Sequence, residues 1–309
     1  MKVIRISLKS VVKLENITLC LGYFDSLHLG HLTLIKKSMN LGRKVGVLTM
    51  DPNPSSFFNA NVKEINSIED KIEILENVGV DYFIILETDR ELLNISAERF
   101  VNDILIPLGV KNVVCGFDYH FGKNKVGDSD MLSYYEEFDT YVCDPVVDNE
   151  EKVSTTLIKS LLKEGNIKRV NKLLTRSYQI KGKVIHGNSL GHTIGYPTAN
   201  VELDENKLYP KSGVYSGYLI VDNNKYLSMI NIGKHPTVKE LNKEIVEVHV
   251  INQTLDLYDK DITLIFDDFI REEKKFKDID ELKETIKTDL KRCLEASRWF
   301  LKTLTDLLF

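Results

Sequence analysis

The sequence of 309 residues has no uninterrupted apolar run of the ~18 residues that a helix needs to cross a bilayer. Residues 1–25 also lack an apolar stretch followed by a small-residue cleavage site, so no signal peptide is expected. The C-terminal segment 299–309 is apolar, but Lys302 and Asp306 interrupt it. We expect this segment to form a helix packed on its own domain, with a membrane anchor as the alternative.

Cysteine is scarce and is not arranged in pairs. The four cysteines include no C-x-x-C pattern, and Cys20, Cys115 and Cys143 lie in apolar segments of strand character. These surroundings favour buried, reduced thiols. No disulfide framework is indicated, and the expected location is the reducing cytoplasm.

An excess of basic residues is also missing. Asp and Glu number 46 against 41 Lys and Arg, which gives a formal net charge of -5. Proteins that bind nucleic acid usually carry a basic stripe, so neither nucleic acid nor an anionic membrane is an expected partner. The chain has 43% hydrophobic and 28% charged residues, the composition of a globular protein, and its length predicts about two domains. We expect a monomer or a weak oligomer.

Strand and helix patterns alternate through the first half of the chain. This alternation predicts βαβ units and a mostly parallel sheet, and short continuous apolar strands indicate a sheet covered on both faces. Ser67 is the expected N-cap of a helix. The expected strands are 17–21, 45–50, 81–86, 112–117 and 140–147, and the expected helices are 31–41, 68–78 and 97–105.

The pattern changes after a helical pair at 156–163 and 167–174. Strand-like segments then follow one another without helices, which predicts a small antiparallel barrel or sandwich. We therefore expect a Rossmann-like α/β domain at 1–178 and a β-barrel domain with terminal helices at 179–309. The expected strands are 179–186, 214–221, 226–232, 245–251 and 262–269, and the expected final helices are 279–293 and 296–308.

The segment GYFDSLHLGH at 22–31 follows the first expected strand and opens the first expected helix. Ligands bind beyond the carboxyl ends of parallel strands, and a helix N-terminus attracts phosphate. His28 and His31 can donate hydrogen bonds to an α-phosphate, which suits nucleotidyl transfer because that reaction needs positioning and charge stabilisation. A metal site or two incidental surface histidines is the alternative. The residues predicted to bind ATP here are Gly22, Phe24, Asp25 and Gly30, together with the two histidines.

A second phosphate-binding candidate begins a helix far downstream. Ser154, Thr155 and Thr156 offer hydroxyl and free N–H groups, and Lys159 adds a cation one turn later. Together with the first motif, these groups suit the β- and γ-phosphates of ATP. A capped helix with a surface lysine is the alternative.

These two motifs resemble the bacterial bifunctional riboflavin kinase/FAD synthetase family. Residues 116–122, GFDYHFG, are similar to the family's G-x-D-F-x-F-G segment near the flavin. Residues 191–200, GHTIGYPTAN, are similar to the kinase's G-R-T-x-G-F/Y-P-T-A-N. The resemblance runs from about residue 15 to about residue 290 and includes Glu247-Val248-His249 and Arg271-x-Glu273-x-x-Phe276.

The resemblance implies that the first domain adenylylates FMN to FAD and releases pyrophosphate, while the second phosphorylates riboflavin to FMN. ATP is the implied substrate of both steps, and Mg²⁺ is the implied cofactor. Glu247 is implied as the general base for the riboflavin 5′-hydroxyl, and Thr198 and Asn200 as oxygen ligands of Mg²⁺. A turn cap and an outward strand residue are the alternative interpretations. The implied flavin contacts are Asp118, Phe121, Asn231 and Arg271, and the implied kinase contacts with ATP are Lys183, Gly187, Gly191, Gly195 and Thr198.

Four positions depart from the family pattern. Lys159 stands in place of an arginine and supplies a point charge instead of a bidentate fork. Ser26 replaces a glycine, Asn53 a histidine and His192 an arginine. A homologue in which only the kinase works, or a flavin sensor without catalysis, is therefore the alternative to a bifunctional enzyme.

Overall fold

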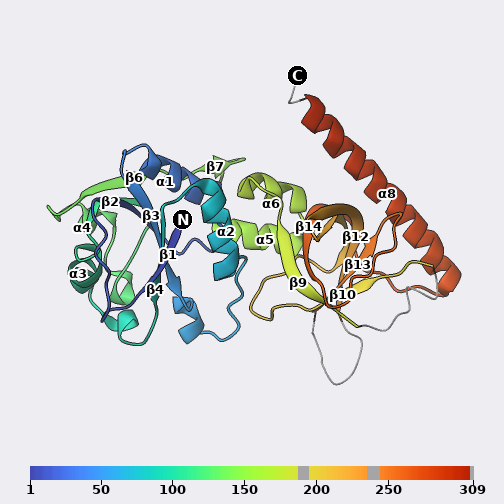
Figure 1. The fold of residues 1–309 in the computed structure, drawn as a ribbon, viewed down its shortest axis with the longest axis horizontal. Coiled ribbons are helices and arrows are strands. Elements are labelled where there is room, and N and C mark those ends of the chain that lie inside the picture. Colours follow the sequence, from blue (N-terminus) through green and yellow to red (C-terminus); the bar gives the residue numbers. More distant parts are fainter. Residues whose placement is uncertain (187–194, 235–243, 307–309) are drawn as a thin grey trace. The chain divides into compact units, whose positions relative to one another are not determined.

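A computed structural model describes residues 1–186, 195–234 and 244–306, with side-chain surroundings given up to residue 296. The chain divides into two compact units, Met1–Leu157 and Ile158–Phe309. Figure 1 shows the helices and strands of both units, coloured along the sequence. None of the helices in these ranges has the length and apolarity needed to cross a membrane.

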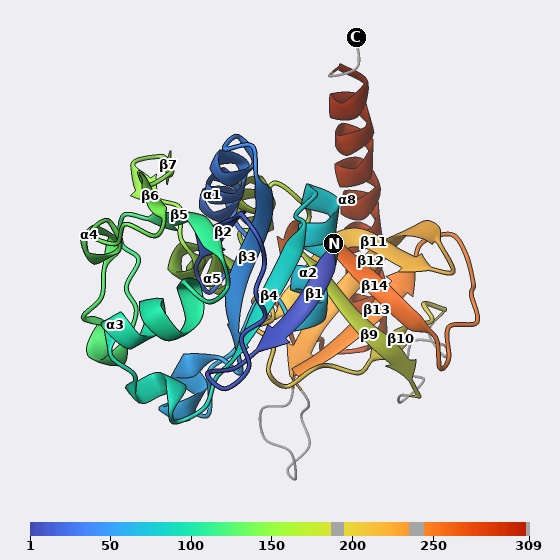
Figure 2. The same ribbon diagram turned by 60° about the vertical axis from the view of Figure 1, so that its left-hand side comes forward.

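The first unit is built on a six-stranded sheet in which every pairing is parallel, in the order β1-β4-β3-β2-β5-β6. Figure 2 shows β1, β4 and β3 side by side. The predicted parallel α/β fold is therefore confirmed. The strands are β1 (Lys2–Ile6), β2 (Ile17–Leu21), β3 (Lys44–Asp51), β4 (Tyr82–Glu87), β5 (Val110–Gly116) and β6 (Asp139–Cys143).

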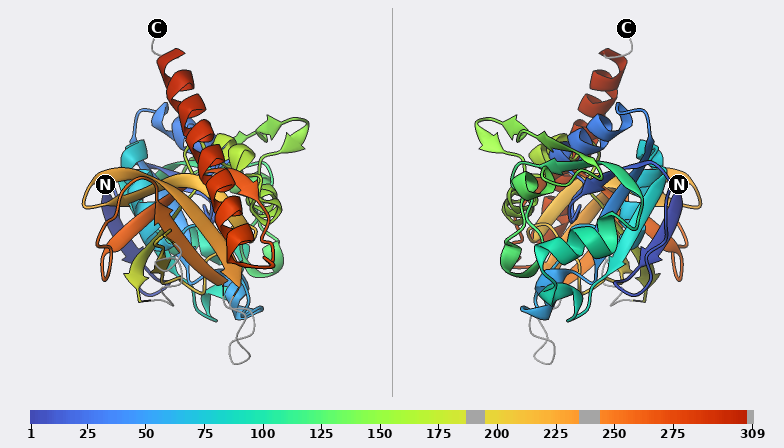
Figure 3. Two further views of the ribbon diagram at one scale, coloured as in Figure 1. Left: turned by 90° about the vertical axis from the view of Figure 1, so that its right-hand side faces the viewer. Right: turned by 90° about the vertical axis from the view of Figure 1, so that its left-hand side faces the viewer.

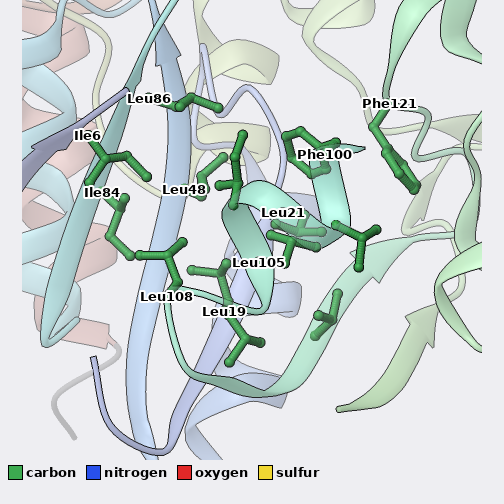
Figure 4. Close-up of a cluster of buried hydrophobic side chains, with 14 of the residues drawn as sticks. Ile6, Leu19, Leu21, Leu48, Ile84, Leu86, Phe100, Leu105, Leu108 and Phe121 are labelled. Carbon is green, nitrogen blue, oxygen red and sulfur yellow. The ribbon is translucent and has the colours of Figure 1, made fainter. Parts of the chain in front are cut away.

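Helices cover both faces of this sheet, as the apolar strands predicted. Leu34 and Ile35 of α1 and Leu75 of α2 join one buried cluster with alternate strand residues. Phe100 and Leu105 lie in the cluster on the opposite face, over strand residues that include Leu48 (Figure 4). The helices are α1 (Leu29–Met39), α2 (Ile68–Val78), α3 (Ala97–Phe100) with a π-helical turn (Val101–Leu105), and α4 (Ser129–Leu132).

Local sequence signals set several boundaries in the first unit. Ser67 caps α2, because its hydroxyl accepts from the backbone N–H of Asp70 and the Asp70 carboxylate accepts in return. Gly79 ends the same helix in the left-handed conformation, with φ 90°. The strand predicted at 140–147 ends at Cys143 instead, because Pro145 cannot donate to a ladder. A hairpin of β7 (Val147–Asp148) and β8 (Glu151–Lys152) follows.

The second unit is a closed antiparallel barrel in the order β10-β13-β12-β11-β14-β9. This confirms the predicted barrel. Helix α5 (Thr155–Glu164) spans the division between the units, and α6 (Ile167–Leu174) packs against β14. The strands are β9 (Gln179–Ile185), β10 (Ala199–Val201), β11 (Gly213–Val221), β12 (Asn224–Lys234), β13 (Glu244–Val250) and β14 (Asp261–Arg271).

One prediction for this unit is wrong. The two helices expected at the end of the chain form a single helix, α8 (Ile279–Asp306), which packs against β11, β12 and β14 (Figure 3). Residues 294–296 are Leu, Glu and Ala, all good helix formers, so nothing in the sequence interrupts the helix there.

Candidate functional sites

The predicted nucleotidyl motif lines a cavity of about 390 Å³ in the first unit. The cavity lies where β2 and β5 end, as expected for a ligand site of a parallel sheet. It brings together three segments that are far apart in the sequence. Its wall includes Gly22, His28, Gly30, His31, Asp118, Ser154 and Thr155.

The loop between β2 and α1 has an unusual backbone. Phe24 and Leu27 both adopt positive φ, 55° and 45°, although both side chains are bulky. Both side chains are fully buried, so core packing holds the loop in this strained form. Phe24 therefore supports the cavity from behind and does not line it.

The two histidines lie one above the other at the start of α1. Their rings stack with centroids 3.8 Å apart, and His28 caps the helix by accepting from the His31 backbone N–H through Nδ1. A Cβ at Gly30 would lie 3.0 Å from the His28 ring, so a side chain there would displace the imidazole. The absence of a side chain at Gly30 therefore leaves room for the His28 ring in this position.

The second phosphate motif meets the first one directly. The Ser26 and Thr155 hydroxyl oxygens are 3.2 Å apart, within hydrogen-bond distance. Ser26 stands where the family pattern has glycine, and its side chain links the two motifs. The Ser154 hydroxyl accepts from the Leu157 backbone N–H, so it caps α5 while lining the cavity. Thr156 is exposed and lies off the cavity wall.

The remaining predicted adenylyl residues have different positions. Asp25 is buried, and its carboxylate accepts from the backbone N–H groups of Ile65 and Asn66 at 2.7 and 3.3 Å. It therefore fastens the loop before α2 and does not line the cavity. Lys159 lies on α5 one turn after Thr155, within the second compact unit. Asn53 caps a short 3-10 helix (Pro54–Phe57) by accepting from Ser55.

The predicted flavin segment reaches the cavity only in part. Asp118 lines it and forms an ion pair with Lys152, whose ammonium also lies 4.6 Å from the centroid of the Phe117 ring. Phe121 is 4% exposed and packs in the core against Phe100, so it is not on the wall. Phe117 and Lys152 were missed by sequence reasoning, although Lys152 precedes Ser154 by only two residues.

The predicted kinase residues lie in the second unit, where Thr198 lines a cavity of about 250 Å³. Next to it, Asn200, Glu247 and Asn231 are direct neighbours in register across β10, β13 and β12. The Asn231 amide donates to the Glu247 carboxylate at 3.5 Å. The predicted base, one predicted metal ligand and one predicted flavin contact therefore form a single row.

The P-T-A-N segment is held by a histidine of the same strand as Glu247. Nδ1 of His249 lies 2.8 Å from the Pro197 carbonyl oxygen. A carbonyl oxygen can only accept, so the imidazole must donate from Nδ1. This hydrogen bond fixes the residue that precedes Thr198.

The other predicted kinase contacts are dispersed. Arg271 forms an ion pair with buried Asp289 at 2.8 Å, and burial raises the pKa of that carboxyl. Lys183 is half exposed and lies 3.8 Å from Asp259, off the cavity wall. Gly195 is exposed with φ 89°. Gly187, Gly191 and His192 lie outside the described residues.

One stretch of the kinase cavity was not identified from the sequence. Residues 253–258 form part of its wall, and the Tyr258 ring stacks on His186 with centroids 4.1 Å apart. This segment connects β13 to β14 and carries no charge cluster or glycine-rich pattern that could have marked it.

Two different family models match the two halves of the chain. A family model described as FAD synthetase matches residues 11–157, and one described as riboflavin kinase matches residues 174–297. A crystal structure named as a macrolide-efflux protein from Streptococcus pneumoniae is similar with a TM-score of 0.88 and 28% identity, over 94% of this chain and 98% of that one.

Curated relatives match across nearly the whole chain. A bifunctional riboflavin kinase/FMN adenylyltransferase from Listeria monocytogenes is 34% identical, over 89% of this chain and 90% of its own length. A protein of the same name from Escherichia coli K12 is 33% identical, over 89% and 91%. Since both halves, both motifs and both cavities agree with these matches, the chain belongs to the bifunctional riboflavin kinase/FMN adenylyltransferase family.

Proposed function

We propose that this chain converts riboflavin to FMN in its barrel and FMN to FAD in its α/β unit, with ATP as the second substrate of each step. The single observation that carries the proposal is that each unit has a cavity lined by part of its motif, with His28 and His31 on one wall and Thr198 on the other. The alternatives of a kinase alone and of a flavin sensor are less favoured, because the nucleotidyl loop retains both histidines and Gly30.

In the adenylyl step, His28 and His31 donate hydrogen bonds to the α-phosphate as negative charge builds up on it. The N–H groups at the start of α1 and the Ser154–Thr155 hydroxyls bind the departing pyrophosphate. Lys159 supports this clamp from α5. The chain contributes no covalent nucleophile, since positioning of the FMN phosphate against ATP is sufficient.

In the kinase step, Glu247 removes the proton of the riboflavin 5′-hydroxyl, and Asn231 orients the Glu247 carboxylate. Thr198 and Asn200 supply neutral oxygen donors beside this carboxylate, which is a set that fits Mg²⁺. The described residues contain no group of three or more His, Cys, Asp or Glu that could hold a metal. Mg²⁺ bound beside Thr198 and Asn200 would keep water and substrate phosphates as its other ligands and would offset phosphate charge.

We assign the adenylyltransferase to residues 1–178 and the kinase to residues 179–309, as the change of pattern indicates. We also expect a cytoplasmic protein that acts as a monomer or weak oligomer. In a gel-filtration run at micromolar concentration, this protein elutes near the mass of one chain.

The test is direct. Purified protein is incubated with riboflavin, ATP and Mg²⁺, and the flavins are separated by chromatography. We expect FMN to appear first and FAD to follow. Accumulation of FMN alone would support the single-activity kinase, and tight flavin binding without any product would support the sensor.

A further inference from the structure

A lysine is completely buried beside the nucleotidyl loop. Lys71 lies in the second turn of α2, and its side chain is 0% exposed. Burial of an ammonium group is costly unless hydrogen bonds and opposite charge compensate it. The groups that surround this one therefore indicate what the lysine does.

Those groups belong to the nucleotidyl loop and to the segment just before α2. The Lys71 ammonium lies 3.5 Å from the Tyr23 carbonyl oxygen and 4.3 Å from the centroid of the Tyr23 ring. It lies 3.8 Å from the Glu64 carboxylate, which also accepts a hydrogen bond from the Tyr23 hydroxyl. Burial and this hydrogen bond raise the pKa of Tyr23, so the phenol stays a neutral donor.

Tyr23 is thus hydrogen-bonded both at its side-chain hydroxyl and at its backbone carbonyl oxygen. Its carbonyl oxygen accepts from the Thr49 hydroxyl at 2.7 Å as well as from Lys71. Tyr23 also lines the cavity, between Gly22 and the strained Phe24. A shift of its backbone would be transmitted along the loop toward the histidines.

Stability alone gives no reason for a lysine at this place. Replacing a buried ion pair by apolar residues of similar volume is often neutral or stabilising. Lys71 donates to the Tyr23 carbonyl oxygen of the loop between β2 and α1, and Tyr23 lines the cavity beside Gly22.

We propose that Lys71 is a positioning residue for adenylyl transfer, which acts through Tyr23 and Glu64 to hold the nucleotidyl loop in its reactive form. This inference rests on the proposed adenylyltransferase activity and adds a residue outside the cavity to its machinery. Lys71 is absent from the cavity wall, so direct contact with substrate is not its role.

The test compares Lys71→Met with Lys36→Met, a matched change at an exposed lysine of α1. We expect Lys71→Met to lower kcat/KM for FAD formation about 10²-fold, the usual effect of misplacing reacting groups by about 1 Å. The KM for ATP should rise as well. Loss of folded protein alone would lower the maximal rate and leave this KM unchanged. Riboflavin phosphorylation in the same samples should stay at the wild-type rate.

Glu64→Gln is the second variant, because it keeps an acceptor for Tyr23 but removes the charge beside Lys71. It should raise the KM for ATP less than Lys71→Met does, and it keeps the inference testable if the methionine variant fails to fold. A wild-type KM in both variants, or in Glu64→Gln when only that variant folds, would overturn the inference. A wild-type chain that binds ATP but forms no FAD would instead contradict the proposed function.

Discussion

Glu247 lies between Asn200 and Asn231 on adjacent strands, and the Asn231 amide lies 3.5 Å from its carboxylate. The Asn231 amide can orient this carboxylate without neutralising it. This arrangement suits a general base better than a structural ion pair, because no described lysine or arginine forms a salt bridge with Glu247 within 4 Å.

Glu247→Gln keeps the size of the side chain and removes the base. We expect FMN formation from riboflavin to fall by roughly 10²–10⁴, the usual contribution of general base catalysis. Conversion of supplied FMN to FAD should persist. Glu244→Gln, at the start of the same strand, is the control and should leave both rates intact. Normal riboflavin phosphorylation by Glu247→Gln would refute the assigned role.

The four cysteines are predicted to differ in their reactivity with thiol reagents. Burial raises the pKa of Cys20, Cys115 and Cys293 to about 12 each, so only ~10⁻⁴ of each thiol is ionised at pH 8. Cys143 is only half-buried and lines the adenylyl cavity, although burial raises its pKa as well.

Titration of the native protein with a thiol reagent at pH 8 should therefore modify Cys143 first and slowly. ATP should slow the modification of Cys143 further by occupying the cavity. In Cys143→Ser, this first phase of thiol modification should be absent. Equal reaction of all four thiols would contradict the burial of Cys20, Cys115 and Cys293, and absence of protection by ATP would contradict ATP binding in this cavity.

At the scale of elements, the sequence predicts best where its signals are local. Helices α2 and α6 have the predicted bounds, because a capping box or an N-cap and a left-handed C-cap mark their ends. Strands β1 and β10 were not predicted. β1 is a sheet edge with a mixed exposure pattern, and β10 is only three residues long. Lys2 and Arg5 interrupt the apolar residues of β1, and β10 is too short for an alternating pattern to be recognised.

The predicted site residues also show that local patterns are recognised from the sequence and that three-dimensional packing is not. His28 was selected from the spacing of its motif and Thr198 from the family resemblance, and each lines a cavity. Phe24, Asp25 and Phe121 belong to the same motifs but support the site from the core, and only three-dimensional packing separates the two roles. The link between Ser26 and Thr155 joins residues 129 positions apart, which no local pattern can reveal.

Helix α6 is predicted to contribute to the stability of the barrel domain. Ile167, Val170, Leu173 and Leu174 are buried, and the Asn171 side chain bonds to both Tyr178 and the Phe266 carbonyl oxygen. Each of these apolar side chains contributes roughly 1.5–3 kcal/mol by burial.

A fragment of residues 158–309 should therefore fold, phosphorylate riboflavin and unfold at a clearly higher temperature than a fragment of residues 176–309. Thermal unfolding followed by circular dichroism measures the difference. Equal unfolding temperatures would mean that the helical residues before position 176 add nothing to the stability of the barrel.

At the scale of the whole molecule, the two compact units each contain a cavity of their own. Among the described residues, the walls of the two cavities have no residue in common. FMN made by the barrel is the substrate of the α/β unit. A defect in either site should therefore leave the other reaction intact when its substrate is supplied.

The most direct measurement is the pair of rates, riboflavin to FMN and FMN to FAD, in the double variant His28→Ala with His31→Ala. Loss of one donor at developing charge costs roughly 3–4 kcal/mol of barrier, so FAD formation should fall at least 10²-fold. Riboflavin should still become FMN at the wild-type rate. Loss of both activities in a variant that remains folded by circular dichroism would contradict the account, because one site would then perform both reactions.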